Sequence, residues 1–171
     1  MTKAYSHIIV LFIALLPLAT HAQTMQFNME IEPELSVEVL QDLNFGTVVT
    51  NSGTLSITKG DSRMGIFKMK ALATQSAILR LQKPAWLTSE QTDVAIPLTL
   101  EAAYAAEQGN YDGAAPFLDG YLHISMNTPE QGSANNSVWQ TGYIYIYGSL
   151  EVGDIPPGAY SAPLVLSVVY E

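Results

Sequence analysis

The feature that most constrains this chain is an alternation of apolar and polar side chains that returns in one segment after another. Because successive side chains of a β-strand point to opposite faces, a period of two indicates a strand that is buried on one face. After a first run at residues 25–45, the alternation recurs at residues 54–58, 67–71, 77–82, 94–104, 121–126, 144–152 and 162–170. The pattern predicts an all-β fold, an immunoglobulin-like antiparallel β-sandwich of about eight short strands.

The first 22 residues differ in composition from the rest of the chain. Lys3 precedes an apolar run from Ile8 to Leu18, and small residues follow up to Ala22. Such a segment is typical of a cleaved secretory signal and is shorter than the roughly 20 residues of a membrane-spanning helix. We therefore expect a signal peptide at residues 1–22 and one β-sandwich domain at residues 23–171. The mature protein is expected in the periplasm, at the cell surface or outside the cell, with no membrane insertion after cleavage.

Two compositional facts exclude whole classes of function. The chain has no cysteine, so disulfides, thiol catalysis and thiolate metal sites are excluded. Its formal net charge of −9 at pH 7 disfavours nucleic acids and anionic membranes as partners, because both bind clustered lysine and arginine. We expect a fold that is held by packing and backbone pairing alone, with no cofactor.

The side chains that carry enzyme or metal chemistry form no recognisable pattern. His123 is the one histidine after residue 22, and by parity it points away from the core. No serine or metal ligand accompanies it at a known spacing, so we expect a non-enzymatic protein. Asn110, Asp112 and Asp119 could offer oxygen ligands to calcium, but they lack the dense ligand alternation of calcium loops. Turns closed by their own side chains are the simpler interpretation, and no metal site is predicted.

A row of tyrosines is the most suggestive candidate surface. If the even-numbered apolar residues of 144–152 face the core, Tyr143, Tyr145 and Tyr147 lie about 6.5–7 Å apart on the opposite face. Such a row suits stacking on a glycan or contact with another protein, and Trp139, in a predicted exposed loop at 127–142, would extend it. The plainer interpretation is that tyrosine is a favoured strand residue that pairs with cross-strand neighbours.

The first alternating run contains a candidate donor strand. Met25, Phe27, Met29 and Ile31 share one face of it, and Pro33, which cannot donate to a β-ladder, separates it from the next strand. Such a segment can complete its own sheet or add to the open edge of a neighbouring subunit. Self-pairing is the simpler alternative. Strand donation would produce self-association, or association with pilin-type subunits, in a protein that has no cysteine.

Three short motifs and a final strand carry a resemblance to a known family. An early L-N-F-G-T stands at residues 43–47, a G-x-L-x-V strand at 148–152, a P-x-G-x-Y turn at 156–160, and a final strand at 164–170 ends on tyrosine. By these motifs the chain resembles a family of secreted bacterial domains of uncharacterised function, which is similar to pilin-like and spore-coat-U-like β-sandwich proteins. The resemblance implies a secreted sandwich. This chain has no cysteine and so differs from cysteine-bearing fimbrial subunits. The route of assembly is therefore left open.

The run at 162–170 is predicted to be the closing strand of the sandwich. Its even-numbered side chains should enter the core, and the Tyr160 hydroxyl should lock the turn at residues 156–158. These features together favour an exported structural or adhesive surface protein, such as a pilin-like subunit. The alternative is a carbohydrate-binding module that uses the tyrosine row.

Overall fold

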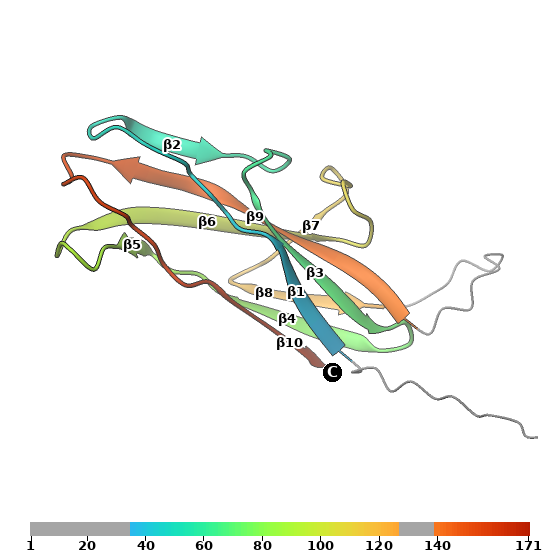
Figure 1. Cartoon of the computed structure of the whole chain (residues 1–171). Helices are drawn as coiled ribbons and strands as arrows, with labels where there is room; N and C mark the ends of the chain where they lie inside the picture. Colours follow the sequence, from blue (N-terminus) through green and yellow to red (C-terminus); the bar gives the residue numbers. More distant parts are fainter. Residues whose placement is uncertain (1–34, 127–138) are drawn as a thin grey trace, which may run out of the picture. The chain divides into compact units, whose positions relative to one another are not determined.

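The computed structural model describes residues 35–126 and 139–171, and every regular element within them is a β-strand (Figure 1). The strands are β1 (Leu35–Gln41), β2 (Gly53–Ile57), β3 (Gly65–Leu72), β4 (Ser76–Gln82), β5 (Trp86–Thr88), β6 (Ala95–Ala105), β7 (Ala115–Pro116), β8 (Tyr121–Ser125), β9 (Trp139–Val152) and β10 (Val165–Tyr170).

The strands form two antiparallel sheets. The larger sheet has seven strands in the order β1-β3-β9-β6-β5, with β2 also beside β9 and β7 also beside β6. The smaller sheet has three strands in the order β10-β4-β8. The long strand β9 is the centre of the larger sheet, because it pairs with β2 and β3 along one side and with β6 along the other. Among the described strands, β1 and β10 each lie at the edge of a sheet.

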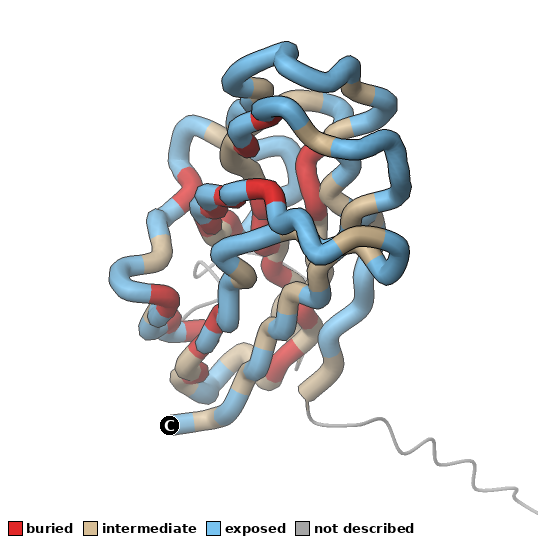
Figure 2. Tube along the Cα trace, turned by 90° about the vertical axis from the view of Figure 1, so that its left-hand side faces the viewer, coloured by how far each residue is buried: buried red, intermediate tan, exposed pale blue. Residues whose placement is uncertain are grey.

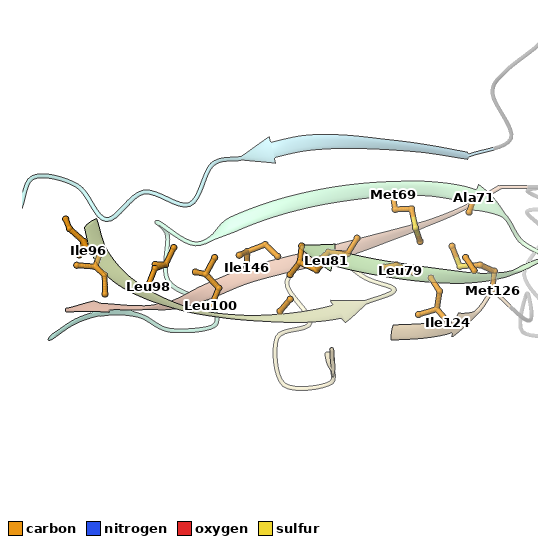
Figure 3. Packing of buried hydrophobic residues seen from close by; sticks show 14 of the residues in the cluster. Met69, Ala71, Leu79, Leu81, Ile96, Leu98, Leu100, Ile124, Met126 and Ile146 are labelled. Atoms are coloured by element: carbon orange, nitrogen blue, oxygen red, sulfur yellow. The ribbon is translucent and has the colours of Figure 1, made fainter. Parts of the chain in front are cut away.

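The main core lies between the two sheets and confirms the predicted sandwich. Leu79 and Leu81 of β4 belong to one cluster with Met69, Ile144 and Ile146 of the larger sheet (Figure 3). Buried and exposed positions alternate along many strands, as the predicted period of two requires (Figure 2). In the final run, the even-numbered residues from 162 to 170 are all partly buried, whereas the odd-numbered ones are exposed.

Two details differ from the sequence-based prediction. The described residues form ten strands instead of about eight, because β5 and β7 are short additions of three and two residues beside β6. The predicted loop at 127–142 was wrong for its last four residues, since β9 begins at Trp139. Gln140, Thr141 and Gly142 give no apolar alternation, but their backbones pair with Ala71, Lys70 and Met69 of β3. Backbone pairing therefore extends this strand beyond its apolar pattern.

A second and smaller cluster covers part of the opposite face of the larger sheet. It consists of Ile57, Met64, Ala103, Ala105, Ala114 and Tyr145. Met64 comes from the loop between β2 and β3, and Ala114 comes from the loop between β6 and β7. The small alanine side chains of β6 leave room beside Tyr145 on this face. Two loops therefore cover a sheet face that the sequence pattern alone suggests is open to solvent.

Candidate functional site

An apolar groove with a volume of about 770 Å³ lies over one half of the larger sheet. Its front wall is the segment 42–50, which contains the L-N-F-G-T motif, and its rear wall is the segment 153–164, which we call the strap. The strap leads from the end of β9 to the start of β10 (Figure 1). The floor consists of inward-facing side chains from β6 and β9: Ile96, Leu98, Leu100, Ile146, Leu150 and Val152.

The groove exists because the smaller sheet does not extend over these floor residues. Among the described residues, no lining residue of the groove belongs to β4 or β8. Figure 3 shows the side chains of Ile96, Leu98 and Leu100 along β6, on the far side of Ile146 from Leu79. This half of the sheet is bordered by the front wall and the strap instead of by a paired strand.

The two edge strands beside the groove leave core-facing side chains exposed. Val37 and Val39 of β1 stand opposite Met69 and Phe67 of β3, so they share the inward face of the sheet. Nevertheless, Val37 is 39% exposed and Val39 is 55% exposed. The inward side chains of β10 (Leu166, Val168 and Tyr170) are likewise only partly buried. The core is therefore incompletely covered where the free edges of β1 and β10 lie.

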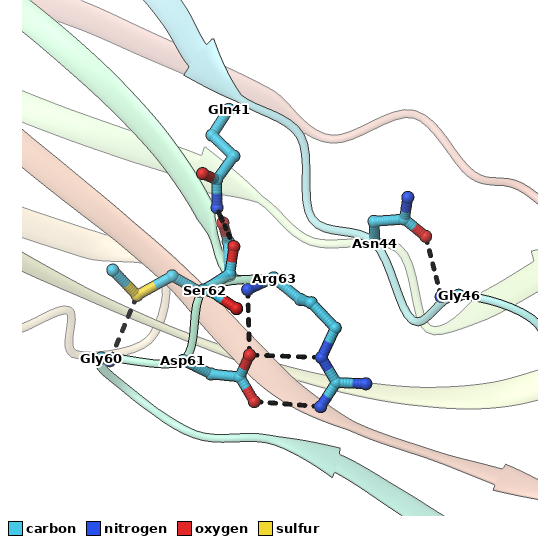
Figure 4. A network of polar contacts seen from close by, with 8 residues as sticks. Gln41, Asn44, Gly46, Gly60, Asp61, Ser62 and Arg63 are labelled. Atoms are coloured by element: carbon cyan, nitrogen blue, oxygen red, sulfur yellow. Dashed lines mark hydrogen bonds and ion pairs between the residues drawn. The ribbon is translucent and has the colours of Figure 1, made fainter.

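Local turns fix the front wall (Figure 4). The Asn44 side chain accepts a hydrogen bond from the amide of Gly46 at 2.8 Å, and Gly46 has a φ of 76°, which glycine adopts readily. The backbone of Asn44 also donates to the carbonyl of Arg63 at 3.0 Å. These bonds tie the L-N-F-G-T motif to the loop between β2 and β3.

That supporting loop is itself braced by an ion pair. Asp61 accepts two hydrogen bonds from the Arg63 guanidinium, at 3.0 and 3.2 Å, and a third from the Arg63 amide at 2.9 Å. The side-chain hydrogen bonds from Arg63 lower the pKa of the Asp61 carboxyl below its ordinary value. Gln41, at the end of β1, donates its side-chain amide to the carbonyl of Ser62 at 2.8 Å (Figure 4). The front wall is thus hydrogen-bonded to a loop that the Asp61–Arg63 ion pair stabilises.

The strap is shaped by its prolines and by Tyr160. The Tyr160 hydroxyl donates to the carbonyl of Pro156 at 3.0 Å, which confirms the predicted lock of the turn. The same hydroxyl lies 3.3 Å from the hydroxyl of Thr92. Further along, Ser161 and Thr88 of β5 exchange two backbone hydrogen bonds, at 2.8 and 3.0 Å. The P-x-G-x-Y motif therefore forms a wall of the groove.

The chemistry of the groove suits an extended, apolar peptide. Its floor offers aliphatic side chains, and the neighbouring edge strands offer unpaired backbone groups along a free edge. A strand added at such an edge gains backbone hydrogen bonds and inserts every second side chain into the core. Within residues 35–126 and 139–171, no group of three or more histidine or carboxylate side chains could hold a metal ion.

The tyrosine row expected on the surface is largely covered. Tyr145 is 0% exposed, and its hydroxyl accepts a hydrogen bond from the Gly109 amide at 2.8 Å and donates to the Glu107 carbonyl at 3.3 Å. The ring of Tyr111 meets it edge-on, with 5.0 Å between the ring centroids. Burial raises the pKa of Tyr145 above its ordinary value. Tyr143 and Tyr147, half-buried on either side, are separated by a covered residue and form no continuous strip.

Tyr145→Phe is expected to destabilise the fold by about 0.5–1.5 kcal/mol, because the Gly109 amide and the Glu107 carbonyl lose their hydrogen bonds to the Tyr145 hydroxyl. The measurement is the free energy of unfolding in urea. Tyr143→Phe is the matched control, because it removes a hydroxyl from the neighbouring half-buried position on the same face. Equal stabilities of the two variants would show that the Tyr145 hydroxyl does not anchor the loop between β6 and β7.

The remaining candidate residues are dispersed. Trp139 lies in β9 instead of a loop and is half-buried, with the Lys70 ammonium 5.0 Å from its ring centroid. His123 is exposed on β8, and its Nδ1 lies 3.8 Å from Oε1 of Glu171. Asp119, with a φ of 51°, and Gly120 form the two-residue turn between the paired residues Leu118 and Tyr121.

The other residues that were considered from the sequence are those of the weighed calcium loop and of the donor strand. Asn110 accepts a hydrogen bond from the Gly113 amide at 3.0 Å, as in the turn interpretation, and the neighbouring Asp112 is exposed. The candidate donor strand (Met25, Phe27, Met29 and Ile31) and the predicted signal peptide lie outside the described residues.

Comparison of the chain with protein-family models and with curated proteins found no match. In the part of the chain that the structure describes, no helix is long and apolar enough to cross a membrane. The groove and its residues are therefore the basis on which a function can be proposed.

Proposed function

We propose that this protein is an exported, non-enzymatic structural subunit of a surface assembly, and that copies link by adding a strand to the groove. The observation that carries the proposal is the exposure of core-facing side chains at two neighbouring free edges, above all Val37 and Val39. A soluble β-sandwich ordinarily covers its core and protects its edges, so an uncovered apolar seam indicates a binding surface. An adhesive role would be a consequence of such an assembly.

The strand that best fits the groove is the segment 25–31 of a second copy. Its four apolar residues, Met25, Phe27, Met29 and Ile31, alternate with polar residues, so that one face can enter the core while the other stays in water. Complete burial of such side chains contributes about 1.5–3 kcal/mol each. No other part of residues 23–34 offers a comparable apolar face.

Closure of the groove by the chain's own segment is disfavoured by parity and by turn chemistry. Odd-numbered residues of β1 face the core, so a hairpin with the two-residue turn 33–34 would place odd-numbered residues of the segment opposite even-numbered ones of β1. The apolar side chains would then face outward. A three-residue loop restores the parity, but Glu32, Pro33 and Glu34 include no glycine or asparagine for its left-handed position. These arguments favour donation to another copy.

A carbohydrate-binding module that uses the tyrosine row is the less favoured function. Its central residue, Tyr145, is buried and bonded to a loop, so a sugar ring has no continuous aromatic surface to stack on.

Removal of residues 23–32 is expected to convert self-associating protein into folded monomers, because each copy loses the strand that it donates. Gel filtration and electron microscopy of residues 23–171 and of the shortened chain measure this. A full-length variant with serine at positions 25, 27, 29 and 31 is the control for length, and it should also be monomeric. A shortened chain that still assembles, or a monomeric parent, would contradict the proposal.

A further inference from the structure

The strap has few backbone groups that can pair with a neighbouring strand. Three of its residues, Pro156, Pro157 and Pro163, have no amide hydrogen to donate to a neighbouring strand. Its bonds to the rest of the described chain gather at two points. One is the backbone pair between Ser161 and Thr88, supported by the contact of Tyr160 with Thr92. The other lies at the opposite end of the strap, next to β9.

At that second point, one hydroxyl joins the two walls of the groove. Oγ1 of Thr50 donates to the carbonyl of Gly153 at 3.2 Å and accepts from the amide of Ile155 at 3.2 Å. The adjacent amide of Asn51 donates to the same carbonyl at 2.8 Å. Thr50 belongs to the front wall, whereas Gly153 and Ile155 belong to the strap. The Thr50 side chain thus joins the two walls between which a bound strand would lie.

The turn that carries Thr50 holds it in place for this contact. The amide of Ser52 donates to the carbonyl of Val49 at 3.2 Å, which closes a tight turn around Thr50 and Asn51. Asn51 has a φ of 59°, in the left-handed region that asparagine tolerates better than most residues. On the strap side, a Cβ added at Gly153 would meet no atom within 4 Å. The turn therefore holds Thr50 in place for its contact with the strap, and there is free space beside Gly153.

We propose that the strap is a gate over the groove and that Thr50 is its latch, so that the Thr50 hydroxyl limits how fast a strand enters and leaves. Separation of the two walls requires the loss of both hydrogen bonds of this hydroxyl and of the backbone bond from the Asn51 amide to the Gly153 carbonyl, while the backbone pair at Ser161 holds the other end of the strap. The device rests on the proposed function, because it controls access to the same groove. It would slow the dissociation of linked copies without any covalent bond between them.

The test is the rate at which copies of the full mature chain exchange partners. Two populations of residues 23–171, labelled with a donor and an acceptor fluorophore, are assembled separately and mixed, and energy transfer is followed with time. Thr50→Val keeps the shape of the side chain and removes both hydrogen bonds, so exchange should become about tenfold faster. Thr50→Ser keeps the hydroxyl and should retain the slow exchange of the parent. Thr47→Val is the matched control, because Thr47 lines the same wall and makes no hydrogen bond to the strap in the described chain.

The outcomes separate the gate from the proposed function. Faster exchange in Thr50→Val alone supports the latch. Equal exchange rates in Thr50→Val, Thr47→Val and the parent overturn the latch while leaving strand addition intact. Absence of any assembly in the parent overturns the proposed function itself. If Thr50→Val does not fold, Thr50→Ser is compared with a Thr50→Ala variant. Equally fast exchange in these two variants overturns the latch. Slow exchange in Thr50→Ser together with fast exchange in Thr50→Ala supports it.

Discussion

Gly148→Ala is expected to abolish folding. A Cβ at this position would lie 2.0 Å from the carbonyl oxygen of Thr99 and 3.0 Å from Cα of Leu100. Both are backbone atoms of β6, which pairs with β9 at this point in the middle of the larger sheet, so neither can move aside as a flexible side chain would. We expect a loss of more than about 4 kcal/mol against a total stability of about 5–15 kcal/mol for a domain of this kind.

Gly153→Ala is the matched control for this substitution. Gly153 follows the end of the same strand, and an added Cβ there meets no atom within 4 Å. The measurement is thermal unfolding followed by circular dichroism, together with the yield of soluble protein. If Gly148→Ala melts within a few degrees of Gly153→Ala, the close approach of β6 and β9 at Gly148 is not as described.

Removal of residues 164–171 is expected to have the second large effect, again loss of the folded state. The deletion removes four inward side chains, Leu164, Leu166, Val168 and Tyr170, and leaves β4 with β8 as its remaining ladder partner. It also removes the Tyr170 hydroxyl, which accepts a hydrogen bond from the Leu72 amide at 2.9 Å and so joins the two sheets. Since complete burial of each apolar side chain contributes about 1.5–3 kcal/mol, the partial burial of four supplies a large part of a total stability of about 5–15 kcal/mol.

Urea unfolding followed by fluorescence measures the effect of this truncation. Replacement of Val165 and Val169 by serine is the control, because these side chains lie on the same strand, are 48% and 56% exposed, and point outward. The control should retain a cooperative transition close to that of the parent. A sharp transition in the truncated chain would mean that β10 is not part of the core.

The sandwich could be predicted because the alternation of apolar and polar side chains is visible within each short segment of the sequence. Leu79, Ile144 and Leu166 each stand in a run with a period of two, and each faces the main core, whatever the order of the strands. The beginning of β9 could not be found in this way. Gln140 and Thr141 are polar, and they are strand residues only because β3 supplies the ladder.

The groove was not predictable from the sequence, although two of its walls correspond to motifs that the sequence makes visible. Which edges remain open depends on the order of strands in both sheets, and a single sequence does not contain that information locally. The covered tyrosine was missed for a related reason. Parity places Tyr145 correctly on the face opposite Ile144, but it says nothing about the loop that folds over it and binds its hydroxyl. The Gly109–Gly113 turn chemistry was the only signal for that loop.

The most direct test of strand addition is amide hydrogen exchange on the chain shortened by residues 23–32, with and without a peptide of residues 23–34. We predict binding, with slower exchange along the free edges of β1 and β10 and at the groove walls, and no binding for a peptide with glutamate at positions 27 and 29. The opposite result, in which the peptide does not bind or protects only surfaces away from the two edges, would contradict an open core that a second copy completes.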